Sequence, residues 1–237
     1  MSTLLLELAG PMQAWGSRSR FATRATELAP TKSGVIGLIA AALGMERTSS
    51  LERFDALRFG VRIDQPGRIE RDFQTARTID GTASMPLSNR YYLADAVFLV
   101  GLEADEAAQL KAFAAAVGRP MFPLFLGRRA FPPAGPIPTE VVELPLIDAL
   151  RTAAWRARER HRRTLREQVT LELVLDAEPG TPKAESIRDV PRSFDPRRRE
   201  YDWRDVRRDS VSISNPDAIP KSTPAEHAPL DIIPEQA

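Results

Sequence analysis

The 237-residue chain has no cysteine and only two histidines. Without cysteine there is no disulfide, no thiolate metal ligand and no thiol nucleophile. His161 lies in an arginine-rich run and His227 in a proline-rich segment, so neither a zinc site nor a Ser-His-Asp arrangement is expected. Metal-independent RNA cleavage usually needs a histidine as general base near neutral pH, and this residue type is scarce here. We therefore expect no bound metal and no cofactor.

Long hydrophobic runs and a strong net charge are also missing. The N-terminal stretch MSTLLLELAGP is too short for a membrane span and lacks the basic residues of a signal peptide. We therefore expect a cytoplasmic protein without membrane contact. The net charge is +1, from 33 basic and 32 acidic residues. This sum does not exclude nucleic-acid binding, because local basic patches can bind phosphates.

What the chain does contain is a strand–loop–helix unit over residues 8–44, around which we expect the fold to be organised. Thr31 is a good N-cap and Gly44 a good C′ residue for the helix between them. The free N–H groups at the start of this helix lie beside Lys32 and Ser33 and suit an anion. The nucleotide-binding pattern GxxxxGK[ST] is not met, because Thr31 stands where a glycine must precede the lysine. This excludes an ATPase site here.

Hydrophobic patterning predicts the element order β-α-β-β-(flap)-β-α-β, which resembles the ferredoxin-like βαββαβ unit with an insertion. Between the third and fourth strands lies a polar stretch over 76–89, which we expect to form an exposed flap. We therefore predict an α+β fold. The predicted strands cover 3–8, 57–63, 68–75 and 91–103, a proline-broken strand and turn covers 120–131, and the helices cover 32–43 and 105–117.

The proline-dense stretch 132–138 suggests a boundary, so we predict a ferredoxin-like domain over 1–138. A smaller β-rich part follows over 139–213, with a strand at 169–175, and 214–237 is expected to be disordered or draped over a partner. The segment 186–208 mixes aromatic residues with arginines. It fits either a nucleic-acid surface or a strand pair with a solvated outer face.

The chemistry that this composition offers is recognition. Arg128 and Arg129 follow Gly127 on a tight turn, where a glycine lets the backbone come close and two arginines suit a phosphate chain. Several aromatic residues can stack on single-stranded bases, although a tryptophan after a turn, such as Trp15, is more often a lid over the core. These aromatic residues are Trp15, Phe73, Tyr91 and Tyr92.

Five motifs in this order resemble the CasD family of type I-E Cascade subunits, within the RAMP superfamily. They are LAGPMQAWG, PTKSGVIGLIAAALG, DFQT, RYYLADAVFLV and PLFLGRRAFPP, and PRSFDPRRREYDWRDV is more loosely similar. The resemblance implies a ferredoxin-like domain with a protruding thumb that includes the 76–89 flap, and a small β-rich C-terminal part. It also implies a non-catalytic subunit that caps the 5′ handle of the CRISPR RNA (crRNA). Its partners would be the backbone and large subunits of the complex, with target DNA contacted indirectly.

The family's RNA-facing motifs place a set of binding residues in this chain. They are Gln13, Trp15, Arg18, Arg20, Lys32, Ser33, Gln74, Thr75, Arg77, Arg90, Arg128 and Arg129. In the family, the DFxT motif commonly carries histidine at the position of Gln74. Glutamine still forms hydrogen bonds but cannot titrate, which disfavours the alternative of a metal-independent endoribonuclease that processes CRISPR repeat RNA.

Overall fold

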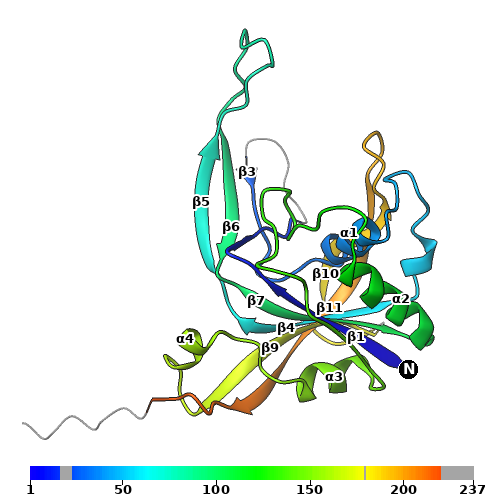
Figure 1. Ribbon diagram of the computed structural model, residues 1–237, viewed down its shortest axis with the longest axis vertical. Coiled ribbons are helices and arrows are strands. Elements are labelled where there is room, and N and C mark those ends of the chain that lie inside the picture. Colours follow the sequence, from blue (N-terminus) through cyan, green and yellow to red (C-terminus); the bar gives the residue numbers. More distant parts are fainter. Residues whose placement is uncertain (17–22, 179, 220–237) are drawn as a thin grey trace, which may run out of the picture.

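The computed structural model describes residues 1–16, 23–178 and 180–219 (Figure 1). Their main sheet has seven strands in the order β10-β11-β9-β4-β7-β1-β8, and all neighbouring strands are antiparallel. The strands are β1 Ser2–Ala9, β4 Arg58–Gln65, β7 Val97–Ala104, β8 Thr139–Val142, β9 Gln168–Asp176, β10 Glu185–Ser193 and β11 Glu200–Ser214. The chain is thus a mixed α/β protein built on an antiparallel sheet.

Helices cover both faces of this sheet (Figure 1). Strand β1 shows why: Leu4, Leu6 and Leu8 join the larger core beneath α1 Lys32–Ala42 and α2 Ala107–Gly118. Leu5 points to the opposite face, which α3 Leu146–Thr152 covers. The remaining short helices are η1 Glu52–Phe54 and α4 Glu159–Arg162.

A second, smaller sheet projects away from the main one (Figure 1). Its central strand is β6 Ser88–Ala94, which pairs with β5 Arg68–Gln74 along one edge. On the other edge it pairs with β2 Met12–Gln13 and, in parallel, with β3 Thr23–Arg24. The exposed tip of the arm joins β5 to β6. We call β5, β6 and this tip, residues 68–94, the arm.

The first helix confirms its predicted caps. The Thr31 hydroxyl accepts a hydrogen bond from the Gly34 N–H, and Gly44 has φ +73° directly after the C-cap Leu43. Strand predictions for β1, β4, β5 and β9 are also confirmed to within two residues at every end.

Two other strand predictions were wrong. The stretch 91–103 is not one strand, because the chain breaks at Asp95 and Ala96 between β6 in the arm and β7 in the main sheet. Residues 120–131 hold bends and turns but no strand, since prolines interrupt the backbone donors. The predicted boundary at 138 falls just before β8, which pairs with β1, and β9 pairs with β4. Strands from both predicted parts therefore share one sheet, and the division itself stays a prediction.

Candidate nucleic-acid interface

The loop that carries Arg128 and Arg129 depends on a glycine in the left-handed region. Gly127 has φ +86°, and a Cβ there would lie 1.7 Å from the carbonyl oxygen of Ala14. The Ala14 N–H donates to the Leu126 carbonyl at 3.1 Å, and the Leu126 N–H donates to the Phe131 carbonyl at 2.7 Å. The two arginines are therefore presented on a closed turn that is fastened to the segment after β2. We call residues 126–131 the arginine loop.

Three arginines from separate segments converge beside this loop. Arg24 of β3 lies opposite Arg90 of β6, and the Arg128 guanidinium donates to the Arg24 carbonyl at 3.1 Å. Burial, reinforced by the positive charges of Arg90 and Arg24, holds the pKa of Arg128 below its ordinary value. The Nε of Arg90 is buried and has no hydrogen-bond partner among the described residues. Crowded like charges and an unused donor indicate a site for an anionic ligand.

A cleft of about 570 Å³ opens between the arm and the arginine loop. It is lined by Met12, Asp72, Gln74, Arg90, Tyr92, Arg128, Arg129, Ala130 and Phe131. Asp72 pairs with Arg90 in register, and alternate residues of a strand share a face, so Gln74 and Tyr92 point to the same side. The rings of Tyr92 and Phe131 pack 5.4 Å apart at an interplanar angle of 57°, which joins arm to loop.

Four predicted RNA contacts meet in this cleft despite their separation in sequence: Gln74, Arg90, Arg128 and Arg129. Thr75 and Arg77 are exposed at the start of the arm's tip. Sequence reasoning did not name Arg24 or Asp72 as site residues. Asp72 could have been found from its alternation with Gln74 along a strand. The place of Arg24 could not, because it depends on the parallel pairing of β3 with β6.

Gln13 and Trp15 are buried instead, with 0% and 1% of their surface exposed. The Gln13 amide donates to the carbonyls of Leu8 at 3.2 Å and Ala96 at 2.9 Å, and its oxygen accepts from the Trp15 indole N–H at 3.1 Å. Both residues therefore hold the chain behind the cleft. A direct RNA contact by either does not fit this geometry, because their polar groups are already used inside the fold.

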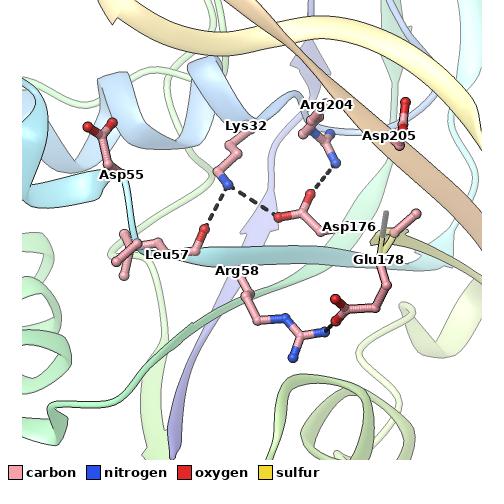
Figure 2. Close-up of a pocket in the computed structure, with 10 residues that line it drawn as sticks. Lys32, Asp55, Leu57, Arg58, Asp176, Glu178, Arg204 and Asp205 are labelled. Carbon is pink, nitrogen blue, oxygen red and sulfur yellow. Dashed lines mark hydrogen bonds and ion pairs between the residues drawn. The ribbon is translucent and has the colours of Figure 1, made fainter. Parts of the chain in front are cut away.

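Lys32 also points inward. Its ammonium donates to the Leu57 carbonyl at 2.7 Å and pairs with Asp176 at 3.2 Å (Figure 2). The anion at the start of α1 is the carboxylate of Asp189, which accepts from the Lys32 backbone N–H at 2.8 Å and from Arg204 Nε at 2.6 Å. The helix start that predicted an external anion therefore holds an internal one. Ser33 beside it is half-buried.

A second hollow of about 600 Å³ lies over this ion network (Figure 2). Its cations have carboxylate partners. Arg58 pairs with Glu178 at 2.8 Å, and Arg204 pairs with Asp176 at 2.6 Å. Its lining carries four carboxylates against three cations, so this hollow lacks the excess of positive charge that distinguishes the cleft.

The other predictions have simpler outcomes. Arg18 and Arg20 lie outside the described residues.

Within the described ranges, no three His, Asp or Glu side chains are grouped so that they could hold a metal ion. His161 lies on α4 and does not line the cleft, and burial lowers its pKa. None of the helices that the structure describes is long and apolar enough to cross a membrane.

Comparison with known proteins extends these findings. The family model described as CRISPR-associated protein (Cas_Cas5) matches residues 3–207, a span that contains both the arm and the arginine loop. The chain is also similar to "CRISPR system Cascade subunit CasD" of Escherichia coli (strain K12). The two are 37% identical over 155 residues, which cover 57% of this chain and 69% of the relative.

Two solved structures resemble this fold over about nine-tenths of the chain. A chain of a "CRISPR RNA-guided surveillance complex" matches with a TM-score of 0.71 and 32% identity, over 90% of this chain and 91% of the other. A structure titled "Crystal structure of Cas protein" matches with a TM-score of 0.68 and 38% identity, over 91% and 97% of the two chains.

Proposed function

Because the chain belongs to the Cas5 family of CRISPR-associated proteins, we propose that it is a non-catalytic, RNA-binding subunit of a type I-E Cascade surveillance complex. Its task is to cap the 5′ handle of the crRNA. Support comes from the similarity to the Cascade subunit CasD and to a chain of an RNA-guided surveillance complex. The observation that carries the proposal is the crowding of Arg24, Arg90 and Arg128 beside the cleft, where none of the three has an acidic ion-pair partner among the described residues.

The chemistry of this cleft suits a single-stranded RNA. Guanidinium groups bind phosphate oxygens, often through two parallel hydrogen bonds. The Gln74 amide donates and accepts, which matches base edges that single-stranded RNA leaves open. Tyr92 adds an aromatic wall. The exposed tip of the arm, with Thr75 and Arg77, corresponds to the thumb that arches over the RNA in this proposal.

The proposal includes a ferredoxin-like core. Its support is the chain order β1-α1-β4-β7-α2-β8 together with the sheet order β4-β7-β1-β8, with both helices over one face. The arm is an insertion between β4 and β7, and strands β9, β10 and β11 form the β-rich C-terminal part. Backbone and large subunits of the complex are the protein partners, target DNA is contacted indirectly, and the assembly works in the cytoplasm.

The non-catalytic role is supported by the side chains that line the cleft, none of which is a histidine among the described residues. A general base there would have to come from Asp72, Tyr92 or an arginine. The ordinary pKa of the carboxyl group lies well below neutral, and those of tyrosine and arginine lie far above it. Incubating the purified protein with CRISPR repeat RNA in EDTA tests the alternative. We expect intact RNA, and a discrete cleavage product would overturn the non-catalytic assignment.

Binding is tested by the double variant Arg128→Ala, Arg129→Ala with a repeat RNA that carries the 5′ handle. We expect affinity to fall by roughly tenfold or more, because contacts to phosphates are lost. The slope of log affinity against log salt should also become shallower by about 0.7 for each phosphate contact removed.

The matched control is Lys111→Ala with Arg119→Ala, which removes the same charge from exposed residues at α2. Affinity and salt slope of this control should stay close to the unmodified protein. Equal losses in both double variants would mean that the overall charge, and not the arginine loop, attracts the RNA.

A further inference from the structure

The cleft contains a side chain that a plain phosphate site would not favour. Among the described residues that line it, Asp72 is the one carboxylate, set within a group of arginines. A carboxylate in the cleft repels the negative phosphates of an RNA chain. It would therefore weaken a site that bound only the RNA backbone. Its presence indicates that part of the ligand at this point donates hydrogen bonds.

Asp72 and Arg90 stand directly opposite each other on β5 and β6, on the same face of the arm. They nevertheless form no ion pair with each other among the described contacts, and the Arg90 Nε has no partner. The Asp72 carboxylate is oriented from within its own strand. One oxygen accepts from the Phe73 N–H at 2.7 Å and the other from the Gln74 amide at 3.4 Å.

Each carboxylate oxygen has two acceptor sites, so these local bonds leave capacity on both oxygens of Asp72. The acceptor pair on β5 therefore sits opposite Arg90 of β6, whose side chain also lines the cleft. A ligand that satisfies both must present two neighbouring donors next to an acceptor.

We propose that Asp72 and Arg90 read the Watson–Crick edge of a guanine in the bound RNA. Guanine presents N1–H and N2–H donors side by side, which match the two carboxylate oxygens, and its O6 accepts from the guanidinium. Adenine, cytosine and uracil each lack two adjacent donors on this edge. Single-stranded RNA exposes the edge for such contacts. This inference rests on the proposed function, and it divides the cleft: the arm reads one base while the arginine loop holds phosphates.

The experiment selects a pool of random eight-nucleotide single-stranded RNAs on the immobilised full-length protein and sequences the bound fraction. We expect guanine to be enriched at one position. Asp72→Asn should abolish that enrichment while RNA binding persists, because asparagine places a donor against the N2 amine and relieves repulsion of phosphates. The control Glu70→Gln makes the same charge change on the same face of β5, outside the cleft, and should keep the enrichment.

A second measurement does not depend on any variant being folded. Replacing the selected guanine by inosine removes the N2 amine, and we expect about a tenfold loss of affinity in the unmodified protein. The same comparison repeated on Asp72→Asn is a separate check, and this variant should bind both RNAs equally.

The outcomes separate the two proposals. If no RNA is retained, the proposed function fails. If RNA is retained without guanine enrichment, or if inosine binds as well as guanine, the function stands and the base-reading role of Asp72 is wrong.

Discussion

The position of the two loop arginines depends on Gly127. Replacing it by alanine puts a side chain in the left-handed region and sets its Cβ 1.7 Å from the Ala14 carbonyl oxygen. Backbone strain alone costs about 1–3 kcal/mol, and the overlap forces the loop away from Ala14. We expect Gly127→Ala to lower the free energy of unfolding by about 2 kcal/mol or more and to weaken RNA binding without any change of charge. Denaturant titration and RNA binding on the same sample measure both effects.

Gly118→Ala is the matched control, because a Cβ at this last residue of α2 meets nothing within 4 Å. Its free energy of unfolding should stay within about 1 kcal/mol of that of the parent. We expect a small increase, because alanine favours a helix more than glycine does. RNA affinity that survives in Gly127→Ala would show that the closed turn is not needed to present the arginines.

Among the secondary-structure elements, the start of α1 is tied to the C-terminal hairpin through Asp189. This carboxylate is 1% exposed and accepts from the helix N-terminus and from two nitrogens of Arg204. Asp189→Ala leaves the nearly buried Arg204 guanidinium with Asp176 as its one carboxylate partner. It also removes the carboxylate that accepts from the Lys32 N–H at the helix start. We expect a loss of about 3–5 kcal/mol in the free energy of unfolding, measured in urea.

The comparison for this variant is Arg198→Ala, which removes an ion pair with Glu200 whose arginine side chain is 82% exposed. Exposed pairs contribute about 1 kcal/mol at most, so this variant should unfold almost as the parent does. Similar losses in the two variants would mean that burial of the Asp189 network adds nothing to stability.

Residues that act on their own neighbours in the sequence, such as caps and turn glycines, predicted the elements that they border. Features that depend on contacts between distant segments were not predicted. The Thr31 and Gly44 caps define α1, and Gly127 with its two arginines marks the turn. The break between β6 and β7 had only a weak signal, because Asp95 alone interrupts the apolar run and no glycine or proline marks the turn. Asp95 turns the chain there with φ +58°, a conformation that aspartate tolerates better than most residues. The cleft itself was unpredictable in detail, since it requires the arm and the arginine loop to meet.

Across the whole molecule, the densest arginine run is not the richest source of free charge. Between 151 and 166, arginines pair with acids from distant segments, including Arg158 with Asp95 and Arg162 with Asp217. The arginines that line the cleft come from the arm and the arginine loop instead, with Arg24 of β3 beside them. The density of arginines along the sequence therefore does not locate the interface, because the fold determines which arginines form ion pairs with carboxylates.

Because strands from both halves of the chain share the main sheet, we expect the chain to fold as one unit. Residues 1–138 lack β9, which pairs with β4, and lack α3, whose Leu146 and Leu150 cover the second core with Leu173 and Leu175. We expect this fragment alone to show no cooperative thermal transition, because one face of its sheet would be left apolar and uncovered. Mixing it with residues 139–237 should restore a cooperative transition and RNA binding. A fragment 1–138 that unfolds cooperatively by itself would instead establish the predicted boundary at 138 as a true domain limit.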